Sequence, residues 1–292
     1  MPATKRQPVK QAKATPKRKV AKSTDAGATS RLSKKYHQAS KTLKPYLKNF
    51  WIFVFIAIVI VGDQITLSAR SLAGVYANAL ALVLLIGLAL WKKQARMLAI
   101  SASILPAANM VNLALPQNTV LAQTVVFYSS LLILALVYRF MFALDQPIEK
   151  SKLGKRGYLT ILPLMILVGQ LLGVIGYFML RHHYSFSITP LPLLAACSII
   201  FAFTEETFFR GLIQQQGSMV LNPALAALLS LIVFTSATIG HVTILSPLFA
   251  LIAGLVLVTT YFKKQNLILT ITINAVAKLV YIGLVAGVII FH

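Results

Sequence analysis

The sequence predicts an all-α protein, a polytopic transmembrane helical bundle of about nine spans that follows a disordered basic N-terminal tail. Of its 292 residues, 58% are hydrophobic and only 12% are charged, and the mean hydropathy is +0.78. A water-soluble domain of this size could not cover so much apolar surface, so lipid is the expected solvent. The apolar residues also gather in runs of about 20, the length that crosses about 30 Å of hydrocarbon.

Residues 1–48 form the predicted tail. They contain 14 of the 28 Lys and Arg residues and a single acid, Asp25, with almost no large apolar residue before Leu32. Such a segment cannot offset its ordering entropy, so we expect disorder. The formal net charge of +22 therefore describes a tail and some loops. We expect a polybasic tail held near anionic lipid headgroups and no nucleic-acid partner.

The apolar runs divide the rest of the chain into two groups of spans. The first four lie within residues 49–144 and the last five within residues 158–292, which we expect to form the functional core. The predicted spans are approximately 50–68, 72–91, 97–115, 119–143, 158–180, 188–216, 222–242, 245–262 and 266–291.

The loop charges predict the orientation of these spans. If the tail is cytoplasmic, 23 basic residues lie on the inner side and only Arg70 and Arg181 on the outer side. This distribution satisfies the positive-inside rule and predicts a plasma-membrane protein with a cytoplasmic N-terminus and an external C-terminus. Reporters fused at Lys150 and at His292 should then lie on opposite sides of the membrane.

Ionisable residues inside the predicted spans are the candidate functional residues, because a charge in lipid is costly. Asp63 and Arg139 lie near span ends, where water or headgroups can solvate them. Glu205, Glu206 and Arg210 lie within one apolar span. Glu206 and Arg210 are spaced i,i+4 and should pair, whereas Glu205 points about 100° away. One glutamate would be held by the arginine and the other would be available as a general base. A simple Glu–Arg staple with an unused second acid is the alternative.

His241 on the following span is the nearest further candidate. With the two glutamates it could position a water molecule, either at a metal site or as an acid/base pair. The spacing of a zincin HExxH motif is absent, and so are a P-loop, a GxSxG motif and a CxxC motif. The single cysteine, Cys197, lies in an apolar run and is expected to serve in packing.

These residues resemble the motifs of the CPBP family, the CAAX-processing and bacteriocin-processing intramembrane proteases that are also called the Abi family. Glu205–Arg210 (EETFFR) matches the family's EExxxR motif and is followed by Gly211. His241 fits the second motif, FxxxH, although Ala237 stands in place of the phenylalanine. In the third motif, HxxxN, Asn274 replaces the histidine and Lys278 the asparagine.

The resemblance implies an intramembrane endopeptidase that uses a glutamate and a histidine to activate water. Glu205 would be the base, supported by Glu206 and Arg210, and His241 would orient water or act as an acid. Asn274 and Lys278 would stabilise the oxyanion, or Lys278 could clamp a glutamate and silence the site. A divalent metal such as zinc would be held by Glu205 and His241.

The resemblance also implies a prenylated, leader-type or other membrane-proximal peptide or protein as the substrate, with membrane lipid as the surroundings. The alternative function is that of a catalytically impaired relative, a bacteriocin-immunity or partner-binding membrane protein.

Overall fold

The computed structural model describes residues 57, 60, 61, 72–115, 120–142, 155–180, 190–238 and 245–291. Contacts divide the chain into two units, Met1–Lys48 and Asn49–His292, and every described residue lies in the second. The described residues form helices and contain no strand, which confirms the predicted fold class.

The helices follow the predicted spans closely. In chain order they are α3 (Leu72–Trp91), the 3₁₀ turn η1 (Lys93–Ala95), α4 (Arg96–Ala114), α5 (Val120–Phe142), α6 (Lys155–Leu180), α7 (Leu191–Phe208), the π-helix η3 (Phe209–Gln214), α8 (Gln215–Val220), α9 (Pro223–Thr238), α10 (Leu245–Lys264) and α11 (Leu267–Phe291). The predicted span at 50–68 lies mostly outside the described residues. The span predicted at 222–242 corresponds to α9, whose described residues end at Thr238, and residues 239–242 lie outside the described residues.

Seven of the described helical segments are long and apolar enough to cross a membrane. They also expose large apolar side chains: Leu72, Leu90 and Phe140 are each more than 70% exposed. In water such surfaces would drive aggregation, whereas lipid tails cover them at no cost. The chain is an integral membrane protein.

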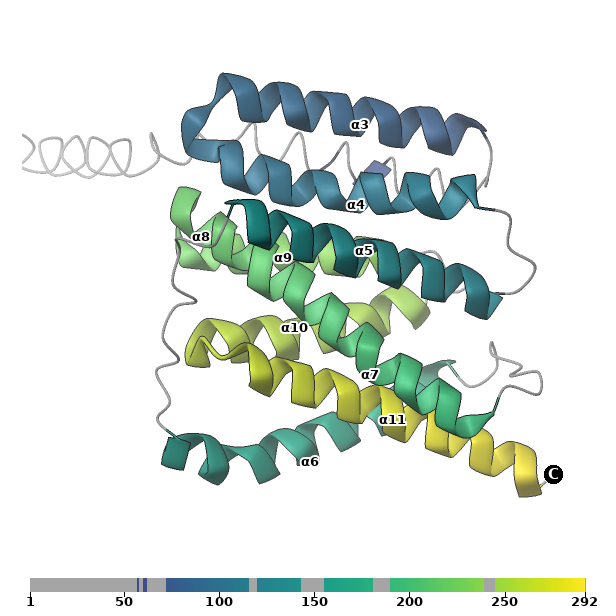
Figure 1. The fold of residues 1–292 in the computed structure, drawn as a ribbon. Helices are drawn as coiled ribbons and strands as arrows, with labels where there is room; N and C mark the ends of the chain where they lie inside the picture. The colour runs from purple at the N-terminus through teal and green to yellow at the C-terminus, as the bar shows by residue number, and fades with distance from the viewer. Residues whose placement is uncertain are drawn as a thin grey trace, which may run out of the picture. The chain divides into compact units, whose positions relative to one another are not determined.

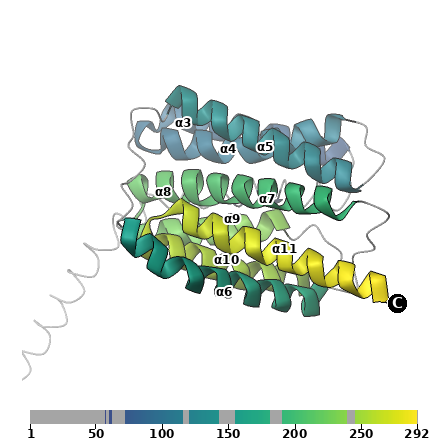
Figure 2. The same cartoon turned by 60° about the horizontal axis from the view of Figure 1, so that its bottom comes forward.

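Helix α7 lies at the centre of the second unit (Figures 1 and 2). In the view of Figure 2, α3, α4 and α5 lie on one side of α7, and α11, α10 and α6 lie on the other. Helices α5 and α11 both contact α7 directly. A side chain on α7 can therefore meet partners from either half of the chain.

Two glycines bring α11 close to α6. A Cβ on Gly169 would lie 2.7 Å from the carbonyl oxygen of Ile273, and a Cβ on Gly173 would lie 2.6 Å from that of Ala277. Small residues four apart allow two membrane helices to approach this closely. The backbone carbonyls that they meet flank Asn274, so this packing fixes the register of the α11 residues that face α7.

Candidate active site

The segment with the two glutamates does not continue as a regular α-helix. After α7 ends at Phe208, the chain forms the six-residue π-helix η3, and the N–H of Phe209 points at the carbonyl oxygens of both Glu205 and Glu206. The hydroxyl of Ser230 on α9 donates to the carbonyl oxygen of Phe209 at 2.8 Å. This bond attaches the wider turn to α9. π-Helical turns within α-helices are frequently found at functional sites.

Glu206 and Arg210 form a fully buried ion pair, as their i,i+4 spacing predicts. The Nε atom of Arg210 lies 3.3 Å from Oε2 of Glu206, and neither side chain is exposed to solvent. The guanidinium carbon lies 4.4 Å from the ring centroid of Phe234 and 5.9 Å from that of Phe209. Among the described residues the Nη1 and Nη2 atoms have no hydrogen-bond partner. The two aromatic rings therefore help to stabilise this buried cation.

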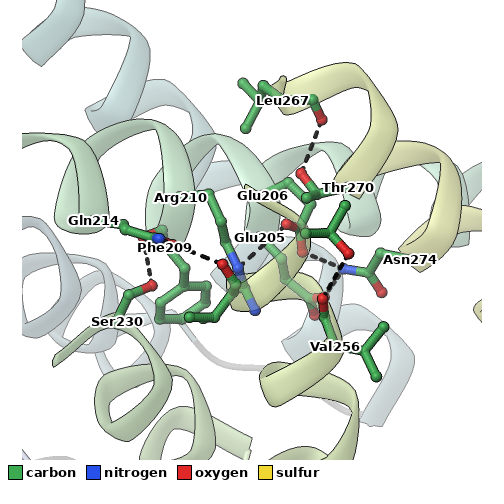
Figure 3. A network of polar contacts seen from close by, with 12 residues as sticks. Glu205, Glu206, Phe209, Arg210, Gln214, Ser230, Val256, Leu267, Thr270 and Asn274 are labelled. Atoms are coloured by element: carbon green, nitrogen blue, oxygen red, sulfur yellow. Dashed lines mark hydrogen bonds and ion pairs between the residues drawn. The ribbon is translucent and has the colours of Figure 1, made fainter. Parts of the chain in front are cut away.

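Asn274 on α11 connects the two glutamates (Figure 3). Its Nδ2 atom donates to Oε2 of Glu205 at 2.8 Å and to Oε1 of Glu206 at 2.9 Å. A side-chain amide has two N–H groups, so both are used on the carboxylates. One amide group thus binds both carboxylates. This geometry leaves Asn274 no N–H to stabilise an oxyanion, which is the role that we expected for it.

Glu205 is held by two further donors. The hydroxyl of Tyr128 on α5 donates to Oε1, and Nζ of Lys278 on α11 donates to the same oxygen at 3.0 Å. The Glu205 side chain is 3% exposed, while that of Lys278 is 29% exposed. The sequence led us to expect Glu205 as the glutamate available for proton transfer, with a clamp by Lys278 as the alternative. In the structure Glu205 forms an ion pair with Lys278, and Glu206 forms a separate one with Arg210.

A cavity of about 220 Å³ adjoins Glu205. Its polar part consists of Glu205, Asn274, Lys278 and hydroxyl-bearing side chains, and the rest of its lining is apolar. The apolar lining comprises Leu172, Leu180, Phe234, Phe249, Ala250, Ala253, Leu257 and Ala277. An apolar group of a bound molecule can therefore lie in this cavity, with the adjacent bond of that molecule facing the carboxylate of Glu205.

The structure brings together five of the six predicted site residues: Glu205, Glu206, Arg210, Asn274 and Lys278. The sixth, His241, lies outside the described residues. Sequence reasoning missed Tyr128, because a tyrosine in an apolar span carries no charge and lies 77 positions before its partner. Sequence reasoning also missed the close contact of α6 with α11, for which Gly169 and Gly173, four residues apart, were the available signal.

The predicted metal site is incomplete in the described part of the chain. That part contains no group of three or more His, Cys, Asp or Glu side chains that could hold a metal ion. The two buried carboxylates already face two cations, Arg210 and Lys278. A divalent ion would bring excess positive charge into this neutral cluster, so the described residues alone do not fit a metal. A metal would depend on His241 and on the displacement of Lys278.

The segment that carries the two carboxylates matches a known protein family. Residues 187–280 match the type II CAAX prenyl endopeptidase Rce1-like family. The match covers about a third of the chain and confirms the predicted resemblance to the CPBP family. The Rce1-like segment contains the carboxylates and both of their cations, whereas Tyr128 lies outside it. No curated protein and no solved structure matches the chain. At the level of the family, these findings support an intramembrane endopeptidase.

Proposed function

We propose that this protein is an intramembrane endopeptidase of the CPBP type, in which Glu205 activates water to hydrolyse a peptide bond. The observation that carries the proposal is a carboxylate that is 3% exposed, lies beside an apolar cavity and is held by three donors from two helices, α5 and α11. A positioned carboxylate in such surroundings suits a general base. The match to a protease family supports the same reaction class.

The proposed reaction begins at Oε2 of Glu205. This oxygen takes a proton from water while the water oxygen forms a bond to the carbonyl carbon of the substrate. The carbonyl oxygen becomes an oxyanion, which an ammonium N–H of Lys278 can stabilise. Collapse of the intermediate breaks the C–N bond, and the proton passes to the leaving nitrogen. By the family resemblance His241 would assist this transfer.

The cavity indicates what part of the substrate it holds. A cavity of about 150 Å³ lined by apolar side chains binds benzene, and pockets for drug-sized ligands begin near 300 Å³. At about 220 Å³, this cavity has room for one bulky apolar group. We propose a membrane-proximal, leader-type or prenylated peptide or protein that places such a group beside the scissile bond.

The test is cleavage of a peptide library by the purified protein in lipid vesicles, read by mass spectrometry. The library contains prenylated and unprenylated peptides, with bulky apolar, small and charged residues near each candidate bond. We expect cleavage beside apolar residues by the wild type and none by Glu205→Gln. A folded wild-type protein that cleaves no member, with or without added zinc, would contradict the proposal.

Lys278 provides a second prediction. An ammonium has three N–H groups, and only one is used on Glu205. If another stabilises the oxyanion, Lys278→Met should lower kcat by about 10²- to 10³-fold, the usual effect of losing such a donor. Lys278→Asn should retain part of the activity, since an amide also donates hydrogen bonds. A rise in kcat in Lys278→Met would show instead that this lysine silences Glu205.

The Lys278–Glu205 ion pair favours one other function. A base that is held by a lysine is a poor proton acceptor, so the protein could be a catalytically impaired relative that binds peptides or partner membrane proteins, as a bacteriocin-immunity protein does. Absence of cleavage by the wild type, by Lys278→Asn and by Lys278→Asn with Asn274→His would support this alternative, provided that each variant is folded.

The remaining parts of the proposal concern location and metal. The loop charges support a plasma-membrane location with the N-terminus in the cytoplasm, for which the reporter fusions are the test. A divalent metal such as zinc, held by Glu205 and His241, is tested by the metal content of the purified protein and by its activity after chelation. A metal-free protein with full activity would rule out this site.

A further inference from the structure

Tyr128 contributes to the candidate site from the part of the chain that precedes the family match. It lies on α5, and its ring stacks on that of Phe201 on α7, with the centroids 4.4 Å apart and the planes inclined by 21°. Its hydroxyl donates to Oε1 of Glu205, and the ring also lines the cavity. Phe201 lies four residues, about one helical turn, before Glu205 on α7. The stacking on Phe201 therefore holds the phenol of Tyr128 beside the Glu205 carboxylate.

The hydrogen bonds of Glu205 make its two oxygens unequal. A carboxylate oxygen has about two lone-pair sites. Oε1 accepts from Tyr128 and from Lys278, so both of its sites are used. Oε2 accepts only from Asn274 and retains one site. A proton from water can therefore be taken only by Oε2, as long as Tyr128 and Lys278 both remain in place.

We propose that Tyr128 is a positioning residue that orients Glu205 so that Oε2 is its proton-accepting oxygen. This inference rests on the proposed hydrolytic function. Without Tyr128, one site of Oε1 would be open, and only Lys278 and Asn274 would limit rotation of the carboxylate about its last bond. The neutral phenol closes that site without adding charge to the buried cluster. The first group of spans thus takes part in the site, through α5.

The same helix offers a matched control in Tyr138. This tyrosine is 3% exposed, and its hydroxyl donates to the backbone carbonyl oxygen of Met97 at 3.1 Å. It lies ten positions after Tyr128 and does not line the cavity. Removal of either hydroxyl costs hydrogen bonding, but of the two tyrosines only Tyr128 contacts Glu205.

The experiment compares Tyr128→Phe with Tyr138→Phe in the cleavage assay. We expect Tyr128→Phe to lower kcat by about 10- to 100-fold, the range expected for a hydrogen bond to a charged group, with KM unchanged. Tyr138→Phe should change kcat by less than about twofold even where it lowers the unfolding midpoint, because its lost bond lies away from the site. Equal effects of the two variants on kcat would overturn the positioning role.

A second measurement reports on the contact without catalysis. With 3-fluorotyrosine incorporated, the fluorine NMR signal of Tyr128 should shift in Glu205→Gln, whereas that of Tyr138 should not. An unchanged Tyr128 signal would overturn the proposal. If the Tyr128 signal shifts in Glu205→Gln but the wild-type protein cleaves no peptide, the contact is confirmed. The proposed function is then overturned, and the positioning role with it. Cleavage that Tyr128→Phe leaves intact would overturn the positioning role alone.

Discussion

Glu205→Gln should lower kcat by about 10²- to 10⁴-fold, the contribution of a well-placed general base. Glutamine has nearly the same shape, and its carbonyl oxygen can still accept from Tyr128 and Lys278, whereas its NH₂ group cannot accept from Asn274 as Oε2 does. It cannot take a proton from water at neutral pH. The loss should therefore appear in kcat measured on the best peptide of the library, with a protein that circular dichroism shows to be folded.

Glu206→Gln is the comparison for this variant. Glu206 faces Arg210 and Asn274 and does not line the cavity, so its loss should first lower stability. We expect Glu205→Gln to be folded and inactive, and Glu206→Gln to be destabilised in the same detergent. If Glu205→Gln kept kcat within about threefold of the wild type, Glu205 would not be the base.

The helices could be predicted because lipid imposes one rule on every span. Each must be apolar and about 20 residues long, and this pattern is visible in the sequence. Even α4, which contains Pro106 and the polar Asn109, is a helix of 19 residues. Its Asn109 is buried and donates to Asn78 on α3 at 3.4 Å. Asn109 thus has a polar partner that the sequence does not reveal.

The site could be predicted only in part. The i,i+4 rule gave the Glu206–Arg210 pair, and the same spacing placed Asn274 and Lys278 on one face of α11. Nothing in the sequence indicated which glutamate Lys278 would contact. That contact depends on how α11 packs against α7 and on the close approach of α11 to α6. Both are tertiary effects.

Arg210→Met should lower the free energy of unfolding by about 3–5 kcal/mol, the usual cost of removing one partner from a buried ion pair. Methionine fills a similar volume but leaves Glu206 without a cation in a site with no solvent exposure. It also removes the charge that lies 4.4 Å from the ring centroid of Phe234. Arg210→Lys should not restore stability, because an ammonium cannot place a planar group over the ring while it reaches the carboxylate. Unfolding of the detergent-solubilised protein in increasing SDS, followed by circular dichroism, measures the effect.

A double-mutant cycle separates the ion pair from the packing of Arg210. Replacing both partners of a buried pair by neutral groups often costs little, so Arg210→Met with Glu206→Gln should be more stable than Arg210→Met alone. We expect a coupling of about 1–3 kcal/mol, as found for residues in direct contact. Arg139→Met is the matched control, because Arg139 is half-buried near the end of α5 and forms no ion pair with a described residue. It should change stability by less than about 1 kcal/mol. If Arg139→Met cost as much as Arg210→Met, or if the cycle showed no coupling, the buried pair would not be what holds the two-glutamate segment in place.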